Sequence, residues 1–360
     1  MGAQPLNREI LLSRLNALSD TEYHIEHLEM KNLGPNLFLP YKELTSIKKK
    51  LLFVLNGSKE SIDPIEIPAL KKQNKENIKP VLSILISSQK DLHFCNETQA
   101  TIYFQLPNCF KSTFAELITL FRENKRIIPW FPAVLIGADY LAAVEFLEQV
   151  QPQKIVSNNT GIAYEAYKKG ISWIAGPHLN IVNSYSLLCL KETLSCSGAF
   201  ISNELNELQI KSIKKPEKFD LFYSIYHPIV LMTSRLCLFH QVTGCVKDKI
   251  DDACILQCEK FATITNLKKK TFFIEKSKGN YHCIYNETNF LNTEIITDIQ
   301  NLISCFLIDL RDIKTETQIG ADKSFIIKLF EDILIGNLKS EKELKQIIHP
   351  TMNAQYKKGI

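Results

Sequence analysis

Five of the ten cysteines in this 360-residue chain fall between Leu231 and Asn286, at positions 237, 245, 254, 258 and 283. Such a group of thiols suits a disulfide framework, a metal or iron–sulfur site, or the packing of a small apolar residue in a core. A chain of this length buries an adequate core without disulfides. Its N-terminus lacks the apolar segment of a signal peptide. We therefore expect a cytoplasmic protein, in which grouped thiols more often serve as ligands or catalysts.

The spacing of these cysteines favours some kinds of site over others. Structural zinc prefers two close pairs, and only Cys254 and Cys258 have that spacing. An iron–sulfur cluster accepts irregular spacing, and four of the five thiols would hold a [4Fe–4S] cluster. A catalytic thiol needs a nearby histidine; His240 and His282 are close in sequence but lie in no nucleophile motif. The remaining cysteines are predicted to be buried small hydrophobes: Cys95, Cys109, Cys189, Cys196 and Cys305.

The elements that must position these residues alternate between apolar strands and amphipathic helices, in units of about 25 residues, which is typical of a parallel α/β sheet. Eight strands would close a (β/α)8 TIM-like barrel, whereas one strand fewer would leave an open doubly wound sheet. The barrel is the preferred prediction. The predicted strands cover residues 81–88, 101–107, 126–135, 154–158, 171–176, 198–202, 219–227 and 305–310.

Polar residues follow several of these strands at their carboxyl ends, where barrel enzymes carry their active sites. His178, Asn180, Glu204 and Arg311 are the candidates for lining a pocket there. Arg311 could bind a carboxylate through two parallel hydrogen bonds. Helix caps and turns also place polar residues after strands, but the chemistry of these four exceeds capping.

The chain divides into segments of different composition. Residues 1–57 predict a small α+β domain, with a strand near residues 22–30, and residues 58–80 are a polar, proline-interrupted linker. Residues 81–340 form the predicted barrel, with a cysteine-rich insertion at 231–290 before the last strand, and residues 341–360 are a C-terminal tail. The insertion is far longer than an ordinary connection, which indicates a function at the face where it emerges.

The net charge of the chain excludes few classes of binding partner. The net charge of +4 and the pI near 8.4 permit RNA as a partner without requiring it. The most apolar stretch, residues 129–147, contains Asp139 and Glu145 and is interrupted by prolines, so no membrane span is predicted.

Three stretches resemble the peptidase U32 family, also called collagenase-like. The first stretch begins with LMTSRLC (231–237) and continues through Gly244-Cys245 to the segment from Phe261 to Leu291. The second is GPHLNIVNSYSL (176–187), and the third is ISNEL (201–205). The resemblance covers most of the chain and corresponds to the C-terminal half of a long family member. It is strongest toward members that act in 23S rRNA 5-hydroxycytidine and tRNA 5-hydroxyuridine formation.

The resemblance implies a function in RNA base hydroxylation that depends on a [4Fe–4S] cluster and on prephenate as co-substrate. It implies the cluster ligands Cys237, Cys245, Cys258 and Cys283, with Cys254 as a substitute for Cys258. Expected partners are tRNA or rRNA and a protein that supplies an N-terminal U32 half. Two alternatives stay open: a collagenase-like peptidase, and a non-catalytic partner or half-subunit of a U32 system. No serine-protease order of residues and no H-E-x-x-H motif supports the peptidase.

Overall fold

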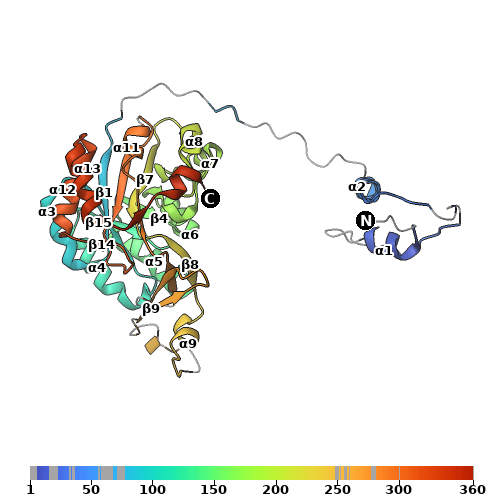
Figure 1. Cartoon of the computed structure of the whole chain (residues 1–360), viewed down its shortest axis with the longest axis horizontal. Coiled ribbons are helices and arrows are strands. Elements are labelled where there is room, and N and C mark those ends of the chain that lie inside the picture. The colour runs from blue at the N-terminus through green and yellow to red at the C-terminus, as the bar shows by residue number, and fades with distance from the viewer. Residues whose placement is uncertain are drawn as a thin grey trace. The chain divides into compact units, whose positions relative to one another are not determined.

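The structure is a computed structural model, and contacts between residues divide it into two units, Met1–Ala69 and Leu70–Ile360 (Figure 1). Each unit is described by itself. The residues described are 6–15, 23–31, 34, 37–55, 57, 68–70, 78–247, 251, 253–254, 258, 260–276, 281–299 and 301–359.

The first unit contains helices α1 (Arg8–Leu15) and α2 (Tyr41–Leu55), which bury Leu11, Leu15 and Leu44 against each other. The strand expected near residues 22–30 is wrong, because residues 23–30 are irregular. Their alternating pattern finds no partner strand in the described part of this unit. Instead Ile25, Leu28 and Met30 pack on the helices. Most of the predicted linker, residues 58–67 and 71–77, lies outside the described residues.

The second unit is a closed barrel of eight parallel strands, as the sequence predicts. Strand β1 pairs with β2 on one side and with the last strand on the other, and pairing of the last strand with β7 closes the ring. The barrel strands are β1 (Val81–Ile86), β2 (Thr101–Gln105), β3 (Ile127–Phe131), β4 (Lys154–Ser157), β5 (Ser172–Ala175), β6 (Gly198–Phe200), β7 (Asp220–His227) and β13 (Cys305–Asp309).

Helices connect consecutive strands, and polar caps fix where several of them begin. The side chains of Asn159, Asn183, Asn206 and Asp322 each accept a backbone N–H in the first turn of the helix that follows. The helical segments are η1 (Gln89–His93), α3 (Phe94–Glu97), η2 (Lys111–Thr113), α4 (Phe114–Glu123), α5 (Ala138–Val150), α6 (Thr160–Lys168), η3 (Pro177–Leu179), α7 (Ser184–Leu194), α8 (Glu207–Ser212), α11 (Ile295–Asp298) and α12 (Lys323–Leu334).

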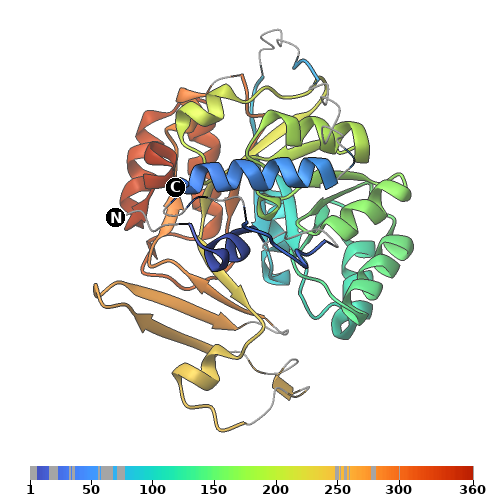
Figure 2. The same ribbon diagram turned by 90° about the vertical axis from the view of Figure 1, so that its right-hand side faces the viewer.

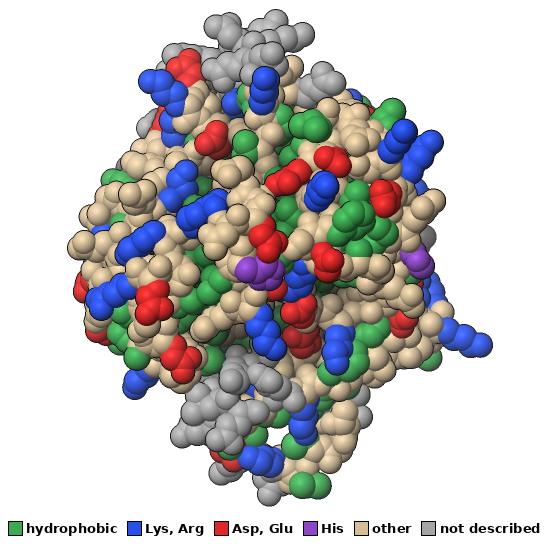
Figure 3. All heavy atoms as spheres, turned by 90° about the vertical axis from the view of Figure 1, so that its left-hand side faces the viewer, with side chains coloured by type: hydrophobic (Ala, Val, Ile, Leu, Met, Phe, Trp, Pro, Cys, Tyr) green, Lys and Arg blue, Asp and Glu red, His purple; other side chains and the backbone are tan. Residues whose placement is uncertain are grey.

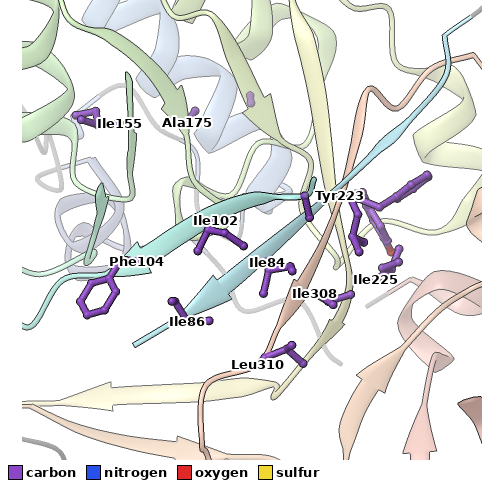
Figure 4. Close-up of a cluster of buried hydrophobic side chains, with 14 of the residues drawn as sticks. Ile84, Ile86, Ile102, Phe104, Ile155, Ala175, Tyr223, Ile225, Ile308 and Leu310 are labelled. Atoms are coloured by element: carbon purple, nitrogen blue, oxygen red, sulfur yellow. The ribbon is translucent and has the colours of Figure 1, made fainter. Parts of the chain in front are cut away.

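Alternation along the strands separates two hydrophobic layers. The larger layer lies between the strands and the helices and includes Ile84, Ile102 and Ile308 (Figure 4). The smaller layer fills the barrel with large side chains such as Tyr103, Trp130 and Phe200. The predicted burial is confirmed for four of the cysteines outside the insertion, but Cys189 is exposed on α7.

The cysteine-rich insertion forms a second, antiparallel sheet in the order β8-β11-β10-β9, which stands out from one end of the barrel (Figure 2). Its elements are β8 (Val230–Ser234), α9 (Leu238–Val242), β9 (Lys260–Thr265), β10 (Thr271–Lys276) and β11 (His282–Tyr285). Strand β12 (Asn289–Leu291) then returns antiparallel to the end of β7.

Residues 341–360 are not a tail, and in this respect the predicted boundary at residue 340 is wrong. Helix α13 (Leu338–Ile347) packs on α12, and β16 (Thr351–Met352) extends the barrel sheet by pairing with β12. The chain continues into α14 (Ala354–Lys358), where Tyr356 is buried. A short antiparallel pair, β14 (Gln318–Ile319) and β15 (Ile348–His349), joins the segment before α12 to the segment after α13. Sequence alone could not reveal pairings between strands that are 60 residues apart.

Candidate functional site

A cavity of about 390 Å³ opens at the carboxyl ends of the barrel strands. This is the size of a small-molecule site. The cavity is lined from inside the barrel by side chains such as Leu85, Trp130 and Leu307, and at its rim by the loops after β5, β6, β7 and β13. Because Val230 and Leu231 of β8 also line it, the cysteine-rich sheet begins at this mouth.

The four residues predicted from strand ends all line this one cavity: His178, Asn180, Glu204 and Arg311. They come from three loops, those after β5, β6 and β13. His178 lies in η3, and Asn180 ends that helix in the left-handed conformation, with φ of 51°. Glu204 is exposed at the rim, and its backbone N–H donates to the Ser202 hydroxyl at 3.2 Å. The structure thus brings together residues that are up to 133 positions apart, because parallel strands in a barrel end at the same face.

An ion pair forms one wall of the cavity. Arg311 donates from Nε and Nη2 to the carboxylate of Asp309, with the shortest contact 2.6 Å from Nη2 to Oδ2. Asp309 is buried at the end of β13 and Arg311 is mostly buried. The neighbouring carboxylate raises the pKa of Arg311 further above its usual range, so the guanidinium stays charged. Asp309 engages Nε and Nη2 of the guanidinium, and no hydrogen bond from Nη1 is found to the described residues.

The position of His178 is fixed by an asparagine from the neighbouring strand end. Asn158 accepts the backbone N–H of His178 at 3.0 Å and donates from its side chain to the Phe131 carbonyl at 3.0 Å. The His178 side chain is exposed to solvent, although many protein atoms lie near its ring. The resulting desolvation, together with the positive charge of Arg311, lowers the pKa of His178 despite the nearby Asp309. His178 is therefore a neutral base or hydrogen-bond partner at neutral pH.

Sequence reasoning did not select two further polar residues of the cavity, His227 and Gln355. Burial lowers the pKa of His227 to about 4, and its Nδ1 is buried without a hydrogen-bond partner among the described residues. Gln355 comes from α14, and its Oε1 is likewise buried and unpartnered. Buried polar atoms without partners are rare, so these two atoms are available to a ligand or a water molecule. The position of His227 at the end of β7 was a usable signal, whereas nothing local to Gln355 indicates the cavity.

The five cysteines of the insertion lie on several different segments. In the described residues of the insertion, no group of three or more Cys, His, Asp or Glu side chains has the geometry to hold a metal ion. Cys237 precedes α9, and the backbone N–H of Cys245 donates to Phe239 in the same helix. Cys283 lies on β11 beside Thr233, and burial raises the pKa of its thiol. The [4Fe–4S] cluster and its ligands stay a prediction of the U32 resemblance.

Comparison with known proteins yields little. No protein-family model and no curated protein matches this chain. Among solved structures, the chain is similar to the YdjI aldolase from Escherichia coli K12, with a TM-score of 0.33 and 9% identity over 75% of this chain and 86% of that one. A likeness of this strength carries no functional argument. No helix in the described part of the chain has the length and apolar character needed to cross a membrane.

Proposed function

We propose that this chain is a U32-type barrel protein that acts in RNA base hydroxylation and binds a small carboxylate co-substrate, with prephenate as the candidate, in the cavity at the barrel mouth. The observation that carries the proposal is the buried Asp309–Arg311 pair in the wall of a cavity of small-molecule size. An arginine held in a fixed orientation binds a carboxylate more selectively than a flexible lysine does.

The other polar residues of the cavity suit the same ligand class. His178 and His227 are both kept neutral by their surroundings, so they can accept a proton or a hydrogen bond without adding charge. Glu204 and Asn180 offer an acceptor and an amide at the rim. The link to RNA hydroxylation comes from the three U32-like stretches, each of which contributes at least one residue to the lining of this cavity.

Two measurements test the proposal. Calorimetric titration of the purified chain with prephenate should give saturable binding, which Arg311→Gln weakens about tenfold or more because the carboxylate loses its charged partner. Arg122→Gln is the matched control, since Arg122 lies exposed on the outer helix α4. Nucleoside mass spectrometry of tRNA and 23S rRNA from cells lacking the chain should show the loss of a 5-hydroxypyrimidine. Unchanged nucleosides together with no prephenate binding would overturn the proposal.

A further inference from the structure

The antiparallel sheet of the insertion presents an exposed aromatic and basic surface on its outer hairpin. Residues opposite each other in antiparallel strands point to the same face, so Phe261, Thr263 and Thr265 share a face with Thr271, Phe273 and Glu275 on the next strand, and Glu275 lies opposite Phe261. Phe261 is 41% exposed although it stacks on Phe273, with ring centroids 5.7 Å apart. An exposed aromatic ring on an edge strand is a surface on which another flat group can stack.

Lysines lie at both ends of this face. Lys314 places its ammonium 5.1 Å from the centre of the Phe261 ring. At the far end, the turn between β9 and β10 exposes three consecutive lysines, 268–270. The turn is ordered by Asn266, whose side chain accepts the backbone N–H groups of Lys268 and Lys270. Positive and negative side chains are interspersed across the side of the molecule shown in Figure 3.

The same face of the sheet leads back to the cavity. Tyr285 lies opposite Phe273 on β11, and its phenol is close enough to Arg311 for the guanidinium charge to influence its pKa. Strand β8 of this sheet lines the cavity, and Lys314 follows Arg311 by three residues. Phe273 and Tyr285 are both buried, so of these three rings only Phe261 is exposed.

We propose that the face formed by Phe261, Thr263 and Thr265, with Lys314 and the lysines 268–270, binds single-stranded RNA, one base stacking on Phe261 and the phosphates contacting the lysines. The proposal rests on the proposed function in RNA base hydroxylation and assigns the RNA-binding surface. Alternating stacking platforms and positive charge are the features that bind single strands with little sequence preference. The lysines complement the phosphate charge.

Fluorescence anisotropy with a labelled single-stranded RNA decamer, recorded over a series of salt concentrations, tests the surface. Phe261→Ala should weaken binding roughly 5- to 100-fold, the usual range for loss of one stacked base. Replacing lysines 268–270 by glutamine should reduce the slope of log affinity against log salt by about 2, since each phosphate contact on a single strand contributes about 0.7.

The chain offers matched controls for both changes. Phe325→Ala removes a similarly exposed phenylalanine, 37% accessible, from α12. Glutamine at positions 48–50 removes another run of three lysines, from α2. Neither control should alter RNA binding, and all variants should bind prephenate like the unaltered chain, which shows that they are folded.

Different results would contradict the proposed RNA-binding surface and the proposed function in RNA base hydroxylation. If the unaltered chain binds RNA and the hairpin variants bind it equally well, the surface is wrong and the proposed function stands. If the control variants weaken RNA binding as much as the hairpin variants do, the proposed surface is also wrong. The same holds if the chain binds anionic vesicles as tightly as RNA and Phe261→Ala does not change the binding of vesicles. If the unaltered chain does not bind RNA but binds prephenate, both RNA proposals fail and the carboxylate site remains.

Discussion

The guanidinium group of Arg311 holds the carboxylate of Asp309, two residues before it in the chain, through three hydrogen bonds of 2.6 to 3.1 Å. The Asp309 side chain is only 4% exposed and that of Arg311 is 19% exposed. The backbone N–H of Arg311 donates to the same carboxylate at 3.1 Å. The pair thus closes the turn after β13 and fixes a positive group at the cavity wall before any ligand arrives.

Arg311→Gln should destabilise the protein by about 3 kcal/mol, because it leaves the buried Asp309 carboxylate without its charged partner. Urea unfolding at pH 7.5 measures the change. The double variant Arg311→Gln with Asp309→Asn should recover much of the loss, since no buried charge remains. If the single and double variants are equally unstable, the cost comes from packing rather than from the unpaired charge.

Gly176→Ala should disturb the support of His178 without touching His178 itself. A Cβ atom at position 176 would lie 2.2 Å from Oδ1 of Asn158, the atom that accepts the His178 backbone N–H. Asn158 is buried, so displacing it breaks two hydrogen bonds, and we expect a loss of about 2–4 kcal/mol.

Thermal unfolding checks this effect, with Gly320→Ala as the control, because a Cβ there makes only ordinary contacts, the nearest at 3.6 Å. Once Asn158→Ala has removed the amide, adding Gly176→Ala should cost little more. Simple addition of the two losses would show that the glycine is needed for another reason.

The sequence predicts the barrel well because its signals are local. Each buried strand reads as a short apolar run, and parallel pairing then brings every carboxyl end to one face, so His178, Asn180, Glu204 and Arg311 meet in one cavity. The alternation of apolar and polar residues at 22–30 predicts a strand wrongly, because a strand also needs a partner strand. The described part of the first unit, Met1–Ala69, provides none.

What the sequence could not reveal depends on contacts between distant segments. Gln355 reaches the cavity only because β16 pairs with β12, and no local pattern reports that pairing. The Asp309–Arg311 hydrogen bonds depend on how the turn after β13 bends, although both residues were visible at the strand end. Crowding of cysteines in the sequence likewise does not by itself place their side chains together. In the described residues of the insertion, Cys237 precedes α9, Cys283 lies on β11, and the other three lie in the segments between.

The cysteines should divide into two groups by reactivity. Burial raises the pKa of both Cys196 and Cys305 to about 12, so they should not react with a disulfide reagent at pH 8 until the protein unfolds. Cys237 and Cys245 are only partly buried and should react in the native protein. Counting released thiolate with and without denaturant, and mapping the labelled peptides, measures both groups.

The same experiment tests the cluster implied by the U32 resemblance. Protein purified without oxygen should be assayed for iron and sulfide before labelling. Near-stoichiometric amounts of both, with Cys237 and Cys245 protected and iron lost in Cys237→Ser but kept in Cys189→Ser, would show that the insertion rearranges around a cluster. Free reaction of these thiols in iron-free protein would exclude the cluster for the chain purified in this way.

His227 should make stability depend on pH in the mildly acidic range. Its pKa in the folded protein is lowered by burial from 6.5 to about 4. Between these values the unfolded chain binds a proton that the folded protein does not, so the stabilisation present above pH 6.5 is lost as the pH falls toward 4. At 1.36 kcal/mol per pKa unit, the loss is at most about 3 kcal/mol, reduced by the partial exposure of the ring.

Urea unfolding of the unaltered protein and of His227→Gln at pH 7.5, 6 and 5 measures this loss of stability. The free energies of unfolding should converge as the pH falls, because other titrating groups, including His282, contribute equally to both proteins. Parallel curves would mean that His227 does not change its charge between the folded and unfolded states over this range.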